Sequence, residues 1–316
     1  MTKKMANPRD AYGEALVELG GKYPTIVVLD ADLSKSTKTI LFAKKYPERF
    51  FEMGIAEANM ISTAAGLASC GKIPFASTFA VFATGRVYDQ IRMDVAYSEA
   101  NVKIFATHGG ISVGKEGASH QMIEDLALMR ALPYMTVCAP SDAAQTRRIV
   151  ELMATTEGPM YARVGRANAP VLYKKEDLEE ILIGKGVMLK DGSDITIFAC
   201  GTMVDQALDA QEQLLKEGIA AGVVDMHTIK PLDEHMVLHC ARHTKGIITI
   251  EEHSIIGGLG SAVAEVLAEH RCGVKFKRLG VQDMFCESGE PEELFEKYGL
   301  SAAVIVDIAQ KFIKSK

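Results

Sequence analysis

The chain has 316 residues, 35 basic and 41 acidic side chains, a formal net charge of −6 at pH 7 and a hydrophobic content of 48%. This composition supports an ordinary globular core and disfavours extended nucleic-acid binding, because an acidic chain lacks the basic footprint that a phosphate backbone requires. A small anionic ligand is compatible with the charge, since two or three local arginines suffice for one phosphate. At about 100–200 residues per domain, the length predicts two domains.

The first residues run from two lysines into polar residues and a proline, without the apolar segment of a signal peptide. No stretch is long and apolar enough to cross a membrane. The cysteines are spread without a CxxC pair, so neither a zinc ribbon nor a thioredoxin-type motif is present. We therefore expect a cytoplasmic protein with reduced thiols and no contact with a membrane. The six cysteines are Cys70, Cys138, Cys200, Cys240, Cys272 and Cys286.

In the first half of the chain, helical periodicity alternates with short β-branched apolar runs. We expect helices over residues 11–19, 57–70, 83–97, 121–131 and 142–155. The first of them is predicted to end at Gly20 and Gly21. We expect strands over residues 25–29, 50–53, 73–77, 102–107, 135–138 and 160–163. Strands separated by single helices predict right-handed crossovers and a parallel sheet covered on both faces.

A polar, charged stretch follows and indicates a linker over residues 168–190, between a first domain of residues 1–167 and a second, smaller α/β domain of residues 191–316. In this second domain we expect strands over residues 195–199, 221–224, 247–250 and 274–279. We expect helices over residues 203–216, 233–242, 260–269, 291–298 and 301–313.

The segments that follow the strands of the first domain are unusually polar, and active sites of open parallel sheets lie at these carboxyl ends. The segments are DADLSKST (30–37), GIAEAN (54–59), TFAVF (78–82) and HGGISVGKEGASHQ (108–121). The last has four glycines within nine residues, flanked by His108 and His120 with Glu116 between them. This pattern predicts a flexible polar loop with a function.

Two of these signals favour a structural interpretation when they are taken alone. Glu57 is a first-turn carboxylate that a helix dipole favours. Phe79 and Phe82 have a spacing that is typical of core packing.

Two motifs in the second domain carry weaker signals. GGLG (257–260) lacks the third glycine of a dinucleotide fingerprint and predicts a tight turn. Three adjacent residues, EEH (251–253), cannot all converge on one metal ion.

Five motifs in chain order nevertheless resemble the C-terminal half of transketolase over essentially the whole chain. They are GIAEANM (54–60), STFAVF (77–82), YDQIRM (88–93), THGGISVG (107–114) and TIKPLD (228–233). The resemblance implies a pyrimidine-binding domain followed by the transketolase C-terminal domain. It also implies thiamine diphosphate as the cofactor, ketol transfer between sugar phosphates and a place in the pentose phosphate pathway.

The family's diphosphate-binding half is missing from this sequence. Its signature is GDG followed about thirty residues later by an asparagine that binds Mg²⁺ or Ca²⁺. The nearest candidate here is Asp191 with Gly192, and no asparagine follows it. The resemblance therefore implies a separate N-terminal subunit that carries the metal and the diphosphate, with self-association into a 2+2 assembly.

The resemblance also assigns site residues. Glu57 falls on the catalytic glutamate, whose carboxyl group shares a proton with the aminopyrimidine. Phe79 and Phe82 fall on the aromatic residues that sandwich this ring, and Asp32 falls on an aspartate near the cofactor.

Four further positions match residues that hold the sugar phosphate: Arg9, Ser36, His108 and Arg166. Two guanidinium groups, an imidazole and a hydroxyl suit a phosphate dianion. His120 matches a residue that meets the donor hydroxyls and shuttles protons, and Glu116 stands where many transketolases have an aspartate that reads donor stereochemistry. Lys115 and Ala118 differ from the residues common at these positions of the family's loop, and the choice of donor and acceptor sugars stays open.

Other interpretations remain at this point. The beta subunit of a 2-oxo-acid dehydrogenase has the same fold, but its substrates carry no phosphate for Arg9, Ser36, His108 and Arg166 to bind. Deoxyxylulose-phosphate synthase is related, but it keeps both halves on one chain. A non-catalytic scaffold has no need for Glu57, the two phenylalanines and both histidines together.

Overall fold

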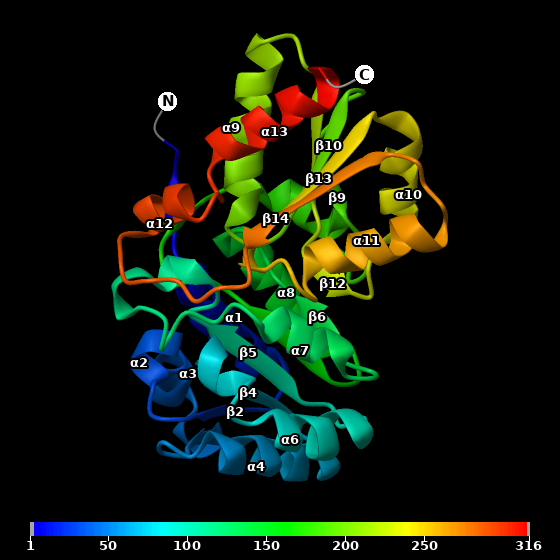
Figure 1. Ribbon diagram of the computed structural model, residues 1–316. Helices are drawn as coiled ribbons and strands as arrows, with labels where there is room; N and C mark the ends of the chain where they lie inside the picture. Colours follow the sequence, from blue (N-terminus) through cyan, green and yellow to red (C-terminus); the bar gives the residue numbers. More distant parts are fainter. Residues whose placement is uncertain (1–2, 315–316) are drawn as a thin grey trace.

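The computed structural model describes residues 3–314, which form two α/β units (Figure 1). The first unit, in the lower half of Figure 1, is built on a seven-stranded sheet, and the second is built on a five-stranded sheet. This confirms the predicted mixed α/β class with mostly parallel strands.

The seven-stranded sheet has the order β12-β6-β7-β5-β4-β2-β3, and only β12 is antiparallel to its neighbour. Its strands are β2 (Ile26–Asp30), β3 (Phe50–Glu52), β4 (Ile73–Phe79), β5 (Lys103–Thr107), β6 (Thr136–Cys138), β7 (Met160–Arg163) and β12 (Thr228–Lys230).

Alternate residues of β2 enter different cores, because successive side chains of a strand point to opposite faces. Ile26 and Val28 pack with α1 (Pro8–Lys22) and α8 (Ala143–Thr155). Val27 and Leu29 belong to the core that includes α4 and α7. The sheet is thus covered on both faces, as predicted. Its remaining helical segments are α2 (Ser34–Thr37), α3 (Ile40–Lys45), η1 (Pro47–Arg49), α4 (Glu57–Ser69), α5 (Ala80–Ala83), α6 (Tyr88–Gln90), η2 (Ile91–Tyr97), η3 (Ile111–Glu116) and α7 (Asp125–Ala131).

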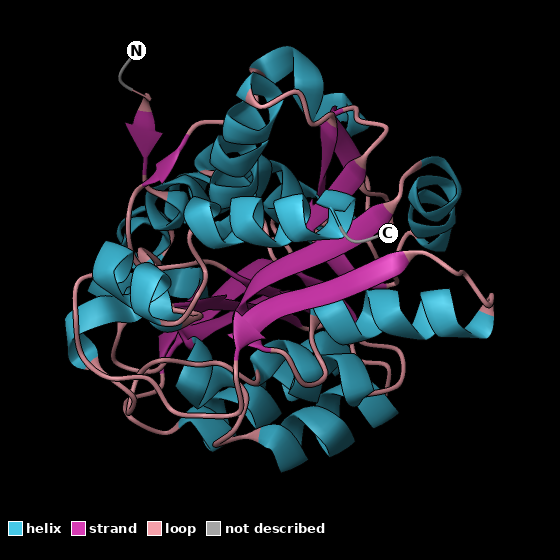
Figure 2. Ribbon diagram, turned by 45° about the horizontal axis from the view of Figure 1, so that its top comes forward, coloured by secondary structure: helices cyan, strands magenta, loops and turns pink. Residues whose placement is uncertain are grey.

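The five-stranded sheet has the order β14-β13-β10-β11-β9 and lies between two pairs of helices (Figure 2). Its strands are β9 (Val187–Lys190), β10 (Ile195–Ala199), β11 (Ala221–Asp225), β13 (Gly246–Ser254) and β14 (Lys275–Val281). Its helices are α9 (Met203–Lys216), α10 (Glu234–His243), α11 (Leu259–Glu269), α12 (Pro291–Lys297) and α13 (Ala302–Lys314). Among residues 3–314, no helix combines the length and the apolarity needed to span a membrane.

Short pairings tie the two units together. β12 follows the second unit's β11 in the chain but pairs with β6 of the first sheet. β1 (Met5–Ala6) pairs with β8 (Ala169–Pro170), at the start of the predicted linker. The rest of that linker contains η4 (Lys175–Glu180) and β9, which is the antiparallel edge strand of the second sheet.

Three predicted boundaries in the first half of the chain were wrong. α1 does not end at Gly20 but continues to Lys22, because Gly20 gives Phe42 and Tyr46 room to pack; a Cβ at Gly20 would lie 2.6 Å from the Phe42 ring. The helix expected over residues 83–97 is interrupted between α5 and α6. The helix expected from residue 121 begins at Asp125, because Met122 forms a parallel bridge with Gly109.

Candidate active site

Most of the predicted site residues lie at the carboxyl end of the seven-stranded sheet. Phe79 is the last residue of β4, and His108 directly follows β5. Ser36 lies in α2, which follows β2, and Glu57 is the first residue of α4, which follows β3. The chain therefore brings residues from distant segments to the edge at which ligands bind in open α/β sheets.

The aromatic residues and the two histidines form one cluster. The ring of Phe79 stacks on His108, with 3.7 Å between their centroids. The ring of Phe82 lies 6.0 Å from that of Phe79, with 14° between the planes. His120 presents its edge to both phenylalanines, at 5.6 Å from Phe82 and 6.2 Å from Phe79. The 6.0 Å between the two phenylalanine rings is too short for another ring to insert, because contact with both would need about 7 Å, twice the carbon contact distance. The face of Phe82 that points away from Phe79 is therefore the better surface for a ring to stack on.

Glu57 is buried beside this cluster, with 3% of its surface exposed. Its Oε1 accepts a hydrogen bond from Nη1 of Arg86 at 2.7 Å. The Arg86 side chain is 47% exposed, and its guanidinium carbon lies 4.2 Å from the centre of the Phe82 ring. A cation stacked on Phe82 thus neutralises the buried carboxylate. Arg86 was not predicted; the only signal was a lone arginine four residues after Phe82.

The cationic group lies next to the aromatic cluster. Arg9 donates from Nη1 to the main-chain oxygen of Ser36 at 3.1 Å. Nε of Arg166 lies 3.3 Å from Oε1 of Glu116. Burial lowers the pKa of Arg9; the positive charge of Arg166 also lowers it, while the negative charges of Asp10 and Glu116 raise it. The two arginines therefore share one electrostatic environment, as expected of residues that bind one anion.

His108 connects the aromatic and cationic groups. Burial, with smaller effects of Arg9, Arg166 and His120, lowers its pKa to about 3. Its Nδ1 lies 2.8 Å from Oγ1 of Thr107. The imidazole is therefore neutral near pH 7, so it contributes hydrogen bonding to this group, and the arginines supply the positive charge.

Asp30, at the end of β2, fixes the segment that carries Ser36. Its Oδ1 accepts from the backbone N–H of Leu33 at 2.7 Å, and its Oδ2 accepts from the hydroxyls of Thr37 at 2.6 Å and Thr39 at 2.8 Å. Burial raises the pKa of Asp30 to about 6, although these hydrogen bonds oppose the shift. Sequence reasoning missed this residue, but an aspartate that ends a strand shortly before two threonines is a recognisable local signal.

Asp32 lies apart from the aromatic cluster. It is exposed, has a positive φ of 63°, and its backbone N–H donates to Oε1 of Glu52 at 2.7 Å. It therefore lies just after β2, next to the end of β3, with which β2 pairs.

The loop of residues 108–121 is less free than predicted. Its middle section forms η3, in which the residues from Ile111 to Gly114 are buried. Ser112 is held by Glu252, which belongs to β13 of the second unit. Sequence reasoning missed this contact, because it joins residues that are far apart in the chain.

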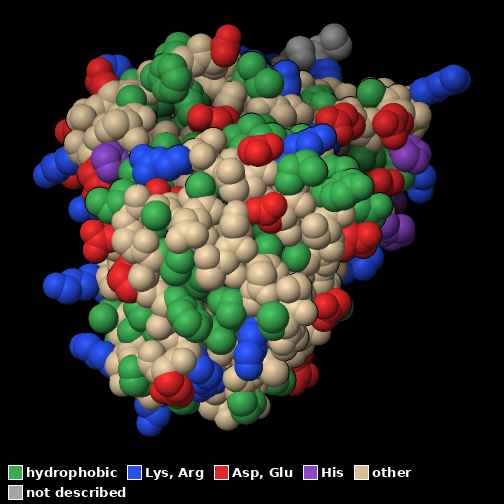
Figure 3. All heavy atoms as spheres, turned by 90° about the horizontal axis from the view of Figure 1, so that it is seen from below, with side chains coloured by type: hydrophobic (Ala, Val, Ile, Leu, Met, Phe, Trp, Pro, Cys, Tyr) green, Lys and Arg blue, Asp and Glu red, His purple; other side chains and the backbone are tan. Residues whose placement is uncertain are grey.

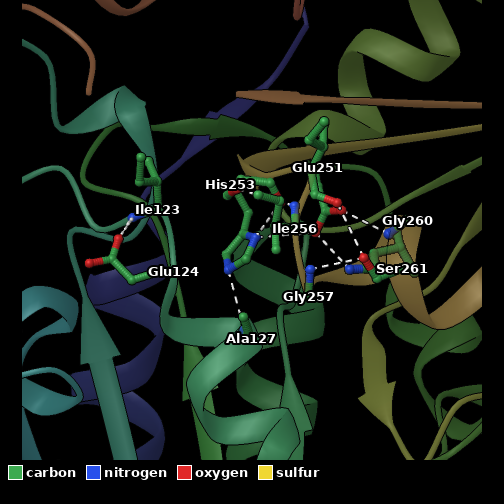
Figure 4. Close-up of polar contacts among 12 residues, drawn as sticks. Ile123, Glu124, Ala127, Glu251, His253, Ile256, Gly257, Gly260 and Ser261 are labelled. Atoms are coloured by element: carbon green, nitrogen blue, oxygen red, sulfur yellow. Dashed lines mark hydrogen bonds and ion pairs between the residues drawn. The ribbon is translucent and has the colours of Figure 1, made fainter. Parts of the chain in front are cut away.

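The adjacent residues Glu251, Glu252 and His253 each have a different hydrogen-bond partner. Glu251 accepts from the backbone of α11, and the ring of His253 meets the backbone N–H of Ala127 (Figure 4). Glu252 accepts from Ser112, and Nδ1 of His253 lies 3.8 Å from Oε2 of Glu251. Among residues 3–314, no group of three or more His, Cys, Asp or Glu side chains is arranged to hold a metal ion. The described residues thus do not fit a metal site.

Comparison with known proteins identifies the family. The model of the transketolase pyrimidine-binding domain matches residues 4–171, and that of the transketolase C-terminal domain matches residues 184–305. A putative transketolase C-terminal section of Methanocaldococcus jannaschii is 51% identical over 94% of this chain and 93% of its own. A 6-deoxy-6-sulfo-D-fructose transketolase subunit of a Clostridium species is 44% identical over 98% and 95%. A solved split-gene transketolase, an inactive beta4 tetramer, superposes with a TM-score of 0.90 at 55% identity over 97% and 98%.

These matches first define a class, the thiamine-diphosphate-dependent enzymes with a separate pyrimidine-binding domain. Within that class, the chain belongs to the transketolase family, whose members are transferases. The residues present fit the cofactor, because a buried carboxylate connected through Arg86 to the face of an aromatic ring suits a flat, nitrogen-containing ring such as the aminopyrimidine.

Proposed function

We propose that the chain is the C-terminal subunit of a split transketolase, which transfers a two-carbon ketol unit from a ketose phosphate to an aldose phosphate. One observation carries this proposal: one aromatic cluster is connected to the buried carboxylate of Glu57 through Arg86, and to the cationic group around Arg9 and Arg166 through His108. Such a site has a place for the cofactor ring and a neighbouring place for a substrate anion.

Glu57, Phe82 and Phe79 would hold the aminopyrimidine of thiamine diphosphate. The Glu57 carboxyl group would share a proton with a ring nitrogen, and Phe82 would support the face of the ring. The guanidinium group of Arg86 lies over the Phe82 ring in the structure, so it would have to move aside if the cofactor ring takes the same face. When bound, thiamine diphosphate stabilises the carbanion that breaking a carbon–carbon bond leaves behind. Asp32 would contact the cofactor.

Arg9, Ser36, His108 and Arg166 would bind the substrate phosphate. Each hydrogen bond to a charged group contributes about 1.5–3 kcal/mol, so two arginines dominate this recognition. His108 would act as a neutral hydrogen-bonding partner, consistent with its lowered pKa. Glu116 would meet the sugar hydroxyls near Arg166, and His120 would exchange protons with the donor from its place beside both phenylalanines.

A second chain would complete this site. We propose an N-terminal transketolase subunit that holds Mg²⁺ or Ca²⁺ and the diphosphate, with self-association of this chain giving a 2+2 assembly. The face that carries α4 supports this proposal: most of its charged side chains lie near the edge, while hydrophobic and uncharged atoms fill the middle (Figure 3). Ile55, just before α4, and Tyr97, at the end of η2, which contacts α4, are each 77% exposed, and α4 exposes small residues such as Ser62 and Gly66. Small and apolar side chains of this kind favour close packing against another protein.

The Clostridium relative is named for a sulfonated sugar, and a sulfonate is also an anion that two arginines can bind. Sulfofructose is therefore a second donor to test. A 2-oxo-acid substrate has no such group, so the cationic group favours ketol transfer over 2-oxo-acid decarboxylation. The cationic group also argues against a non-catalytic scaffold, because a scaffold has no need for a substrate-binding site.

The test mixes this chain with the N-terminal subunit, thiamine diphosphate, Mg²⁺ and an aldose phosphate as the acceptor. Ketol transfer from xylulose 5-phosphate, ketol transfer from 6-deoxy-6-sulfofructose and decarboxylation of pyruvate are assayed in parallel. We expect ketol transfer from a phosphorylated or sulfonated ketose and no pyruvate decarboxylation. Pyruvate turnover without ketol transfer would show that the chain is a 2-oxo-acid dehydrogenase subunit.

A further inference from the structure

We propose that Glu252, in the second unit, is a positioning residue for the loop of residues 108–121. Its carboxylate fixes the first turn of η3, and through this turn it sets the places of His108, Glu116 and His120. The inference rests on the proposed function for the identity of the substrate that the loop meets. The contact itself is independent of that function.

The carboxylate of Glu252 is almost fully enclosed, with 3% of the residue exposed. Oε2 accepts a hydrogen bond from the backbone N–H of Ser112 at 3.0 Å, and Oε1 accepts from the hydroxyl of Thr202 at 2.7 Å. A buried carboxylate needs such donors, because its desolvation is costly. Oε2 thus binds the loop, while Oε1 is bound by Thr202 of the second unit.

Gly110 shows how closely the loop backbone lies on this carboxylate. It has a φ of +78°, and a Cβ built there would lie 2.3 Å from the carboxyl carbon of Glu252. A side chain at Gly110 would therefore displace either the loop or the carboxylate. The glycine-rich sequence that predicts flexibility instead allows this close approach.

The main chain of Glu252 is also fixed from the first unit. Its carbonyl oxygen accepts from Nη2 of Arg163 at 3.0 Å. Nη1 of Arg163 donates to Asp125 at 2.9 Å, and Tyr161 donates its hydroxyl to the same carboxylate. Burial lowers the pKa of Arg163, but the neighbouring carboxylates dominate and raise it, so the guanidinium stays charged. Glu252 is thus a rigid support.

The far end of the loop is held by the second unit as well. Nε2 of Gln121 donates to the carbonyl oxygen of Glu287 at 3.0 Å. Nζ of Lys115 lies 2.6 Å from Oε1 of Glu290, in an exposed ion pair that contributes little. The second unit contains none of the predicted site residues, yet it contacts both ends of a loop that contains three of them.

Glu251 provides a matched control. It is buried next to Glu252 in β13, but its side chain points to the other face of the strand. Its two oxygens accept from the backbone N–H groups of Leu259 and Gly260 at 2.7 Å each, at the start of α11 (Figure 4). The two side-chain carboxylates therefore accept equal numbers of hydrogen bonds, but only that of Glu252 contacts the loop.

The first experiment measures amide hydrogen exchange in the full-length isolated chain. Glu252→Met keeps the side-chain volume but removes both acceptor oxygens, whereas Glu252→Gln keeps an acceptor for Ser112. We expect about tenfold faster exchange over residues 110–116 in Glu252→Met, because one charge-assisted hydrogen bond is lost. Glu252→Gln restores protection, and Glu251→Met speeds exchange only near α11. Equal loop exchange in Glu251→Met and Glu252→Met would overturn the proposal.

The second experiment uses the chain assembled with its N-terminal subunit. We expect Glu252→Met to raise KM for xylulose 5-phosphate by about tenfold relative to Glu251→Met, at matched thermal stability, since a misplaced loop weakens substrate contacts. An unchanged KM in a variant with a mobile loop would contradict the positioning role. If Glu252→Met does not fold, Thr202→Val removes only the supporting hydroxyl, and a smaller change in the same direction is expected. Absence of ketol transfer by the wild-type assembly would count against the proposed function, while the exchange experiment would still decide the role of Glu252.

Discussion

The carboxyl ends of the two parallel sheets differ in how they use charged side chains. At the end of the first sheet, Arg9, Arg86 and Arg166 are partly exposed and face a cluster of aromatic rings. At the end of the second sheet, Asp225 and Glu252 are buried and bound to other protein groups. The same topology thus offers a ligand edge in one unit and a structural junction in the other.

The comparison teaches that polar residues after a strand do not by themselves indicate a ligand site. Oδ2 of Asp225 accepts hydrogen bonds from Ser141, Gln145 and Tyr173, and these donors belong to the first unit and the linker. Buried carboxylates that accept several hydrogen bonds in this way hold the units together. The partly exposed cations are the ones that we propose to bind a ligand.

The largest effect is expected for Glu57→Gln. We expect ketol transfer by the assembled enzyme to fall by roughly 10²–10⁴-fold, because an amide cannot share the proton that general acid–base catalysis requires. Steady-state kinetics would measure this loss, and gel filtration would verify that the assembly still forms. Near-normal turnover would show that Glu57 is not a catalytic residue, and it would contradict the proposed difference between the two sheet edges.

Arg166→Ala should raise KM for xylulose 5-phosphate by about 10–100-fold with a smaller change in kcat, because it removes charge-assisted hydrogen bonds to the phosphate. Arg147→Ala is the matched control, since Arg147 pairs with Glu14 and Glu18 away from the site. If both variants have the same KM, the exposed arginine at the first sheet has no role in phosphate binding.

Asp30→Asn should change how stability depends on pH. Because the pKa of Asp30 is raised to about 6 in the folded chain, its contribution to stability is present below the unfolded pKa of about 3.8 and is lost as the pH rises through 6. The free energy of unfolding of the wild type, relative to Asp30→Asn, should therefore rise by up to about 3 kcal/mol between pH 7 and pH 4. Urea unfolding at several pH values measures this difference, and parallel curves would exclude the raised pKa.

Asp233→Ala is the smallest of these changes and probes the second unit. Asp233 caps α10 by accepting from the backbone N–H of Met236 at 3.1 Å, and it also accepts from Gly186. We expect the free energy of unfolding to fall by about 1–2 kcal/mol, while KM for the sugar phosphate stays unchanged. A raised KM would show that destabilising the second unit at any position weakens substrate binding. It would then count against a specific positioning role for Glu252.

The sequence predicted the second unit more accurately than the first. Its helix over residues 203–216 and its strand over residues 195–199 have the predicted bounds, because strong periodicity and local burial determine them. β1, β8 and β12 have two or three residues each and exist only through pairing with distant strands. Local sequence contains little information about such pairings.

The site was predicted from several motifs together, whereas single residues left structural interpretations open. Glu57, Phe79 and His108 were assigned from the order of their motifs in the chain. The structure stacks Phe79 on His108 and connects Glu57 to Phe82 through Arg86. Arg86 and Glu252 were missed because their contacts join segments 29 and 140 residues apart. Spacing rules describe neighbours along one helix or strand and do not reach so far.

The central claim is that this chain supplies only the pyrimidine half of a cofactor site. Isothermal titration calorimetry of thiamine diphosphate with Mg²⁺ tests it most directly, applied to this chain, to the N-terminal subunit and to their mixture. We predict tight binding by the mixture, weaker binding by the N-terminal subunit alone and none by this chain, with Glu57→Gln weakening the mixture. Tight binding, or ketol transfer, by this chain alone would contradict the claim.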